Sequence, residues 1–144
     1  MWAYLWKEKL DFLVSCINSC DPYRSREVFW NKVEDSGFLN YPYLVMASDL
    51  NFTLSEVEIW GSSGRSEPLG LYLCQLLLRH GLMDVPLAKI MPTWWNGCVE
   101  DARVCKRLDR VIITELLVDN VDRFRSWVIQ SSISDHMSIS FQVE

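Results

Sequence analysis

Three short polar segments of the sequence contain side chains that could do chemistry. They occupy residues 48–51 (SDLN), 107–110 (RLDR) and 134–136 (SDH), and each borders a strand-like apolar run. Their carboxylate and imidazole groups are of the types that transfer protons in general acid–base catalysis. Each segment alone also has an ordinary explanation. An Asp at a strand end is more often a cap or turn residue, a lone His more often makes a routine hydrogen bond, and RLDR alone indicates an alternating, partly solvated strand.

Runs of apolar residues predict the strands that must position these segments. We expect a strand that runs into a turn at residues 93–97, and further strands at residues 11–17, 43–47, 107–114 and 138–143. The run at 43–47 ends directly at the SDLN segment. Polar residues that follow a buried strand often lie at the edge of a sheet, where sites are built.

Two helices are expected among these strands. Asp21 and Pro22 suit a helix start, because Asp can cap backbone N–H groups and Pro loses nothing at the first helical position. Gly37 is a natural end for this helix. Residues 68–79 predict a second helix, although Gly70 weakens it. Its apolar stripe, expected to face the core, consists of Leu69, Leu73, Leu76 and Leu77. The mixture of elements predicts a layered α/β or α+β sandwich.

The composition indicates one globular, acidic domain. The chain has 144 residues, of which 49% are hydrophobic and 23% charged, and its formal net charge is −5. A strongly basic nucleic-acid-binding surface is therefore not supported, although a protein that holds a cation with carboxylates can still meet phosphate locally. No apolar run reaches the length of a membrane span, and the first ten residues lack the apolar stretch of a signal peptide. We expect an intracellular protein, nuclear or cytoplasmic, without a membrane partner.

The cysteines and histidines argue against a zinc site. Five Cys are present without any Cys-x-x-Cys pair, and there are only two His. Reduced thiols, some of them in the core, are the simpler interpretation.

Together and in this order, the polar segments resemble the endonuclease/exonuclease/phosphatase superfamily, which contains the DNase I-like nucleases. The likeness is greatest to the endonuclease domains of plant LINE-type retroelements, which carry GDFN, then TW, then RLDR, then SDH. Thr93 and Trp94 supply the TW segment here, and Arg26 and Trp30 also resemble the family pattern. The resemblance covers residues 5–144. It implies that residues 1–144 form a single α/β domain, the C-terminal part of a DNase I-like sandwich of two β-sheets flanked by helices.

The resemblance also implies a chemistry, namely metal-dependent hydrolysis of phosphodiesters in DNA with Mg²⁺ or Mn²⁺. By this resemblance, Asp49 would deprotonate the attacking water and Asn51 would position it. His136 would hydrogen-bond a phosphoryl oxygen, while Asp109 would hold its other ring nitrogen and raise its pKa. Asp135 would lie beside the metal. All five side chains should therefore converge at one end of the sheets.

One departure from the family pattern predicts weak activity or none. The first half of the family domain, which brings an Asn and a metal-binding Glu, has no counterpart here, and Glu8, Glu27 and Glu34 do not occupy a matching context. The cation would then be weakly held. Two alternatives to a DNA endonuclease stay open, a non-catalytic remnant of a retroelement and a phosphatase of the same superfamily.

The segment around RLDR raises two further alternatives. Its basic side chains either face phosphate or form a solvated strand edge; they are Arg103, Lys106, Arg107 and Arg110. Of Trp94 and Trp95, alternation along the strand predicts that one lies in the core, whereas the other could stack on a base.

Overall fold

The largest sheet of the protein has five strands. The structure is a computed structural model that describes residues 2–7, 10–18, 23–61, 68–130 and 134–144. The strand order is β1-β2-β3-β8-β5, and only β2 and β3 pair in parallel. The strands are β1 (Trp2–Lys7), β2 (Leu10–Asn18), β3 (Leu44–Asp49), β5 (Leu82–Asp84) and β8 (Asp109–Thr114). The parallel pair requires a crossover, and helix α1 (Tyr23–Asp35) supplies it.

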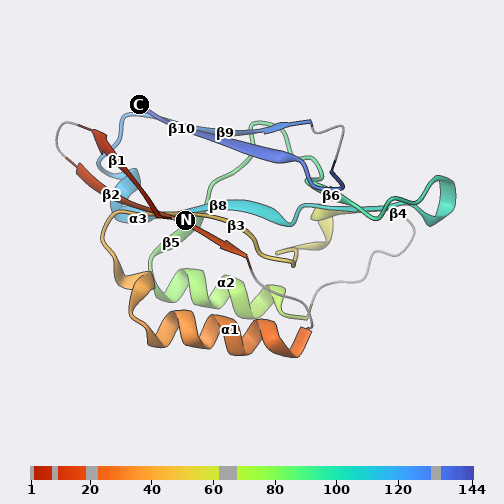
Figure 1. Cartoon of the computed structure of the whole chain (residues 1–144), viewed down its shortest axis with the longest axis horizontal. Helices are drawn as coiled ribbons and strands as arrows, with labels where there is room; N and C mark the ends of the chain where they lie inside the picture. The colour runs from red at the N-terminus through yellow and green to blue at the C-terminus, as the bar shows by residue number, and fades with distance from the viewer. Residues whose placement is uncertain (1, 8–9, 19–22, 62–67, 131–133) are drawn as a thin grey trace.

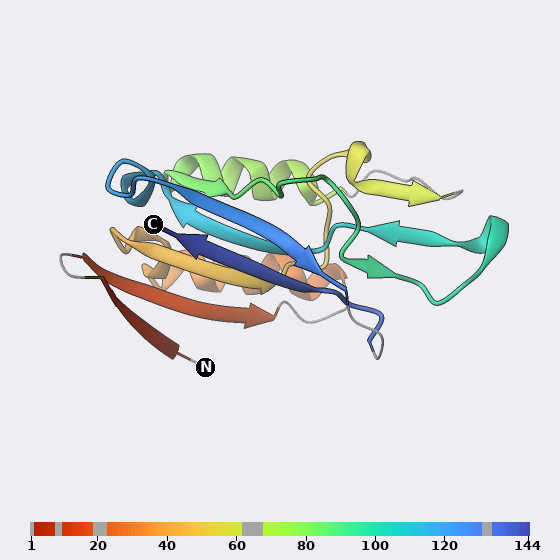
Figure 2. The ribbon, with the colours of Figure 1, turned by 90° about the horizontal axis from the view of Figure 1, so that it is seen from above.

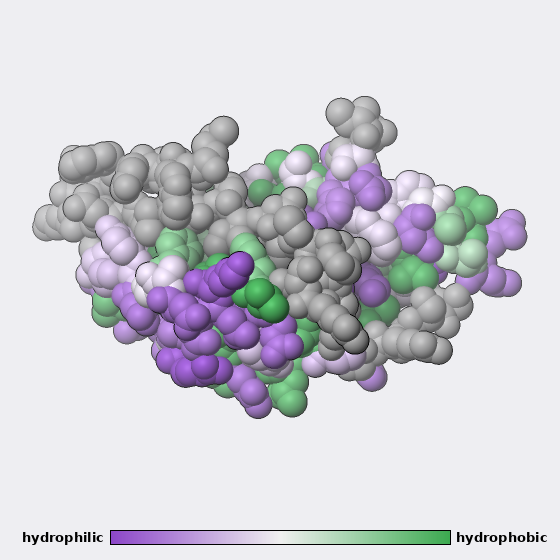
Figure 3. All heavy atoms as spheres, turned by 60° about the horizontal axis from the view of Figure 1, so that its bottom comes forward, coloured by the Kyte–Doolittle hydropathy of each residue, from purple (hydrophilic) through white to green (hydrophobic). Residues whose placement is uncertain are grey.

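Two helices cover one face of this sheet, and a β-hairpin covers the other (Figure 1). The helices are α1 and α2 (Gly70–Arg79), and the hairpin joins β9 (Phe124–Ile129) to β10 (Ser138–Val143). A short helix, α3 (Glu115–Val118), follows β8. Exposed polar residues such as Glu27, Lys32 and Asp35 make the outer side of the helix layer largely hydrophilic (Figure 3).

Alternation along the central strands fills two separate cores. On the helix side, Met46 and Ile112 pack with Trp30 and with the leucine stripe of α2. On the hairpin side, Val45 and Ile113 pack with other apolar residues, including Phe124, Ile139 and Phe141. The period of two along a strand is the physical reason that one strand serves both layers.

A three-stranded sheet projects beyond one end of the central strands (Figure 2). Its strand order is β4-β7-β6, and all pairs are antiparallel. The strands are β4 (Ile59–Gly61), β6 (Trp94–Trp95) and β7 (Val104–Lys106). Three short 3-10 helices connect the larger elements at Phe38–Asn40, Glu56–Glu58 and Glu100–Ala102.

The structure confirms most of the elements expected from the sequence. The leucine stripe of α2 is buried, and Gly37 ends the α1 segment with a left-handed φ of 74°. The expected helix start at Asp21 and Pro22 lies outside the described residues. Gly70 does not interrupt α2, because it is the first residue of the helix. A Cβ at this position would lie 2.6 Å from the Thr53 carbonyl oxygen, so the close contact requires a glycine. No helix among the described residues is long and apolar enough to cross a membrane.

Candidate active site

The ends of β3 and β8 bring two carboxylates together. These strands are antiparallel, and Asp49, the last residue of β3, stands opposite Asp109, the first residue of β8. Beyond β3, the chain turns at Asn51, which has a left-handed φ of 56°. The backbone N–H of Asn51 donates to Asp49 Oδ1 at 3.0 Å, so the turn directs this carboxylate.

His136 joins the two carboxylates from a different part of the chain. Its Nδ1–H donates to Asp109 Oδ2 at 3.0 Å, and its Nε2 lies 3.8 Å from Asp49 Oδ2. The bond to Asp109 fixes the tautomer and orientation of the ring. One ligand atom from each of the three residues lies within 4.8 Å of the others.

The surroundings of His136 favour its charged form. Partial burial is the largest single influence and would lower the pKa of His136, but the hydrogen bond to Asp109 and the charges of Asp109, Asp49 and Asp135 together outweigh it. The pKa is raised as a result, which agrees with the direction expected from the sequence. A protonated imidazole at this position can donate a hydrogen bond to an anionic oxygen.

Asp49 is shifted in the direction that suits a base. Burial is the largest cause of its raised pKa, and the nearby charge of Asp109 adds to it. Hydrogen bonds from Asn51 and the charge of His136 act in the opposite direction but do not cancel the shift. A carboxylate with a raised pKa accepts a proton more readily than an ordinary aspartate does.

Asn51 and Asp135 lie next to this group rather than inside it. Asp135 is exposed, and its Oδ2 accepts a hydrogen bond from Trp94 Nε1 at 3.1 Å. Asn51 contacts Asp49 through its backbone and its side chain. The structure thus brings Asp49, Asp109 and His136 together, with Asn51 and Asp135 at the margin.

The donor atoms at this site fit a hard divalent cation, although only loosely. Asp49 and Asp109 supply carboxylate oxygens, and their mutual repulsion favours a cation between them. Asp109 Oδ2, however, is engaged by His136. Among the described residues this is the one group of side chains able to hold a metal, and it contains no Glu. Water would have to complete the coordination of Mg²⁺ or Mn²⁺.

Arg26 supports the turn that carries Asn51. A guanidinium nitrogen of Arg26 donates to the backbone carbonyl of Asn51, and Arg26 Cζ lies 5.9 Å from the centre of the Phe52 ring. Trp30, one turn further along α1, is fully buried. Both residues resemble the family pattern in the sequence, and the structure places Arg26 next to the candidate site.

The two arginines of RLDR neither face phosphate nor line a solvated edge, so both alternatives are wrong for them. Arg107 and Arg110 are buried and form ion pairs with Glu58 and Asp84. Charges this deep in a protein require partners. The sequence gives no local signal that Glu58 and Asp84 are those partners, since they lie 49 and 23 residues from Arg107.

The expectation that one of the two tryptophans lies in the core is wrong. Neither Trp94 nor Trp95 enters the core; both are half-buried. Trp94 holds Asp135, and the exposed Arg103 lies over the Trp95 ring with Cζ 5.8 Å from its centre. Both rings stay partly exposed in the small sheet, which projects beyond the central strands (Figure 2).

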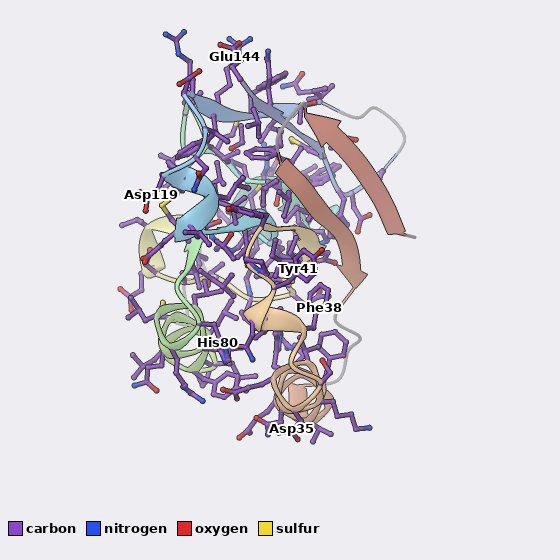
Figure 4. The ribbon with its side chains drawn as sticks, turned by 90° about the vertical axis from the view of Figure 1, so that its left-hand side faces the viewer. Asp35, Phe38, Tyr41, His80, Asp119 and Glu144 are labelled. Atoms are coloured by element: carbon purple, nitrogen blue, oxygen red, sulfur yellow. The ribbon has the colours of Figure 1, made fainter. Side chains whose placement is uncertain are left out.

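The second histidine serves a different purpose at the opposite end of β3 and β8. His80, at the end of α2, lies beside the segment with Phe38 and Tyr41 (Figure 4). Its ring nitrogens lie 3.0 Å from Asn40 Oδ1 and 3.0 Å from Glu34 Oε1. A surface cavity of about 390 Å³ opens here. The polar groups of His80, Asn40 and Glu34 engage one another and join α1 to α2.

Comparison with known proteins assigns the fold. No protein-family model and no curated protein matches the chain. The structure, however, is similar to the endonuclease domain of TRAS1, a telomere-specific non-LTR retrotransposon, with a TM-score of 0.65 and 22% identity over 99% of this chain. The fold is DNase I-like.

Two further solved structures agree with this assignment. The 3'-5' exonuclease NExo from Neisseria meningitidis gives a TM-score of 0.61 at 16% identity, covering 95% of this chain. Truncated TDP2 from Caenorhabditis elegans gives 0.52 at 15% identity, covering 99% of this chain. The present chain spans 62%, 62% and 58% of the lengths of the TRAS1, NExo and TDP2 chains. The expected α/β architecture is thereby confirmed.

Proposed function

We propose that this chain is a metal-dependent phosphodiester hydrolase of the endonuclease type, that DNA is its substrate, and that it is weak on its own. The observation that carries the proposal is the arrangement of Asp49, His136 and Asp109, in which a base and a hydrogen-bonded imidazole face the same small space. The nuclease names of two structural neighbours support the reaction class. The order of the sequence segments supports an origin among plant LINE-type retroelements.

The geometry supports the following role for each residue of the site. Asp49, with its raised pKa, takes a proton from the attacking water, and Asn51 orients that water from the adjoining turn. The protonated His136 donates a hydrogen bond to a phosphoryl oxygen as negative charge develops there. Asp109 keeps the His136 ring in place, and Asp135, at the margin of the group, would lie beside a bound metal. A bound Mg²⁺ or Mn²⁺ would supply further stabilisation of the phosphoryl charge.

Weak activity is part of the proposal because the carboxylates are few. Glu58, a buried glutamate near β8, is engaged by Arg107 and Arg110. Glu34 pairs with His80 and Arg79. Neither belongs to the three-residue group at the site. The same observation favours the second candidate, a non-catalytic remnant derived from a retroelement. We further propose that residues 1–144 form one domain that corresponds to the C-terminal part of a longer DNase I-like domain, and that the protein acts inside the cell.

A plasmid-nicking assay tests the function. Supercoiled plasmid is incubated with the purified chain and Mg²⁺ or Mn²⁺, beside Asp49→Ala, His136→Ala and the matched control Asp122→Ala. Asp122 is exposed, and its backbone N–H donates to the Glu144 carbonyl, at the end of β10 opposite to His136. We expect faint nicking that Asp122→Ala retains and the two site variants lose. Nicking equal in all four proteins would refute the proposal. Hydrolysis of p-nitrophenyl phosphate without nicking would instead favour the phosphatase.

A further inference from the structure

Thr93, the residue before β6, is fully buried and hydrogen-bonds to two backbone segments that carry residues of the candidate site. One is the segment that leads from β7 into β8 and contains Leu108 and Asp109. The other is the segment around His136. Leu50, the residue after β3, in turn donates its N–H to the Leu108 carbonyl at 3.0 Å.

The Thr93 hydroxyl holds the Asp109 side of the site. Its Oγ1 accepts hydrogen bonds from the backbone N–H of Leu108 at 2.9 Å and of Asp109 at 3.0 Å. These are the two residues at which the chain enters β8. Buried N–H groups need an acceptor, and here a side chain provides one for both.

The Thr93 main chain holds the His136 side. Its carbonyl accepts from the Met137 N–H at 2.7 Å, and its own N–H donates to the Lys106 carbonyl at 2.9 Å. The adjacent Trp94 forms an isolated antiparallel bridge with His136. One residue thus touches the backbone on both sides of the bond between Asp109 and His136.

We propose that Thr93 is a positioning residue that keeps Asp109 and His136 within hydrogen-bond distance by fixing both backbones at once. Asp109 and His136 are 27 residues apart, and their side chains meet at an intermediate, partly solvated position. Such a contact keeps its geometry only when the two backbones are fixed relative to each other. The catalytic importance of this positioning rests on the proposed function. The placement of Asp109 and His136, however, can be measured without an activity assay.

The test compares Thr93→Val, which keeps the shape but loses the hydroxyl, with Thr93→Ser, which keeps the hydroxyl. The matched control is Thr114→Val, because Thr114 is another buried threonine whose hydroxyl donates to the Pro42 carbonyl at the far end of β8. Amide hydrogen exchange of Leu108, Asp109 and Met137 and the NMR signal of the His136 Nδ1 proton are recorded for each full-length variant.

In Thr93→Val, we expect exchange at Leu108 and Asp109 to accelerate about 10-fold or more relative to core amides, with loss of the His136 Nδ1 proton signal. Thr93→Ser should restore both readouts, and Thr114→Val should leave both unchanged. If Thr93→Val does not fold, Thr93→Ala, which leaves room for a water molecule, replaces it. An intact Nδ1 signal in a folded variant without the hydroxyl would overturn the inference. A lost signal in a protein whose wild type never nicks DNA would leave the positioning role standing and refute the proposed function instead.

Discussion

At the scale of single residues, two side chains of the candidate site have raised pKa values. The pKa of Asp49 is raised mainly through burial, whereas that of His136 is raised because its hydrogen bond to Asp109 and the charges of the nearby aspartates together outweigh burial. For the carboxylate, a raised pKa strengthens the base; for the imidazole, it extends the charged form toward neutral pH. In the proposed mechanism the active form has Asp49 ionised and His136 protonated, so we expect activity to be confined to the pH range between these two titrations.

Removal of the Asp109 carboxylate should lower the pKa of His136. Asp109→Ala deletes both the hydrogen bond and a negative charge, so the remaining influence of burial should bring the pKa of His136 down from its raised value. NMR titration of the ring protons measures the shift. The titration also has a consequence for stability. Because the folded pKa is raised, the contribution of His136 to stability is fully present below the unfolded value of about 6.5 and is lost as the pH rises through the folded value. An unmoved titration in a folded Asp109→Ala protein would show that the bond does not govern His136.

At the scale of elements, a buried charge cluster joins β8 to its neighbours. Arg110 is fully buried and pairs with Glu58 beside β4 and with Asp84 on β5. Arg107 makes equivalent contacts, and the arginines hold the pKa of Glu58 below its usual value despite burial. The cluster borders Asp109 on both sides in sequence, so it connects the small sheet to the strand that carries the site.

Breaking this cluster should destabilise the protein strongly. Arg110→Met leaves Glu58 and Asp84 with one arginine between them in a buried setting, and we expect a loss of about 3–5 kcal/mol in the free energy of unfolding. Urea denaturation followed by tryptophan fluorescence measures it. The matched control is Arg79→Met, which breaks the more exposed pair with Glu34 and should have a much smaller effect. An equal loss in the free energy of unfolding in both variants would show that the buried ion pairs are no more important for stability than the exposed one.

At the scale of the whole molecule, the paired carboxylates of the candidate site lower the stability of the folded protein. Two carboxylates face each other at the end of the central sheet, and the raised pKa of Asp49 means that its ionised form is less favourable in the folded state than in the unfolded chain. The folded protein is most stable while Asp49 is protonated, and it loses this stability as the pH rises and Asp49 ionises. A bound divalent cation would offset this cost.

Asp49→Asn should therefore raise the melting temperature at neutral pH in the absence of metal, since it removes one of two negative charges that repel each other. Millimolar Mn²⁺ should raise the melting temperature of the wild type slightly, because a weakly held ligand stabilises only near or above its dissociation constant. The same ion should not stabilise Asp49→Asn. Calorimetry with and without EDTA measures both effects, and a wild type indifferent to Mn²⁺ would argue for the non-catalytic remnant.

The sequence by itself determined the elements with strong local patterns. The leucine stripe of α2 repeats at helical spacing, and the alternating residues of β10 match a strand with one face toward the core. These helix and strand patterns are short-range signals that form without distant partners. Through its resemblance to a known superfamily, the order of SDLN, RLDR and SDH also predicted the DNase I-like fold and the residues that meet at the candidate site.

The tertiary structure alone decided what depends on distant contacts. The short strands β4, β5 and β7 exist through their partners in a sheet, because three residues carry too little periodicity to be recognised. Arg107 and Arg110 are buried because Glu58 and Asp84 arrive from other elements to pair with them. Thr93 was visible in the sequence only as part of a TW motif, whereas its hydrogen bonds to both sides of the site exist because the fold returns distant residues to it. Leu108 and Asp109 follow Thr93 by 15 and 16 positions, and Met137 lies further along the chain.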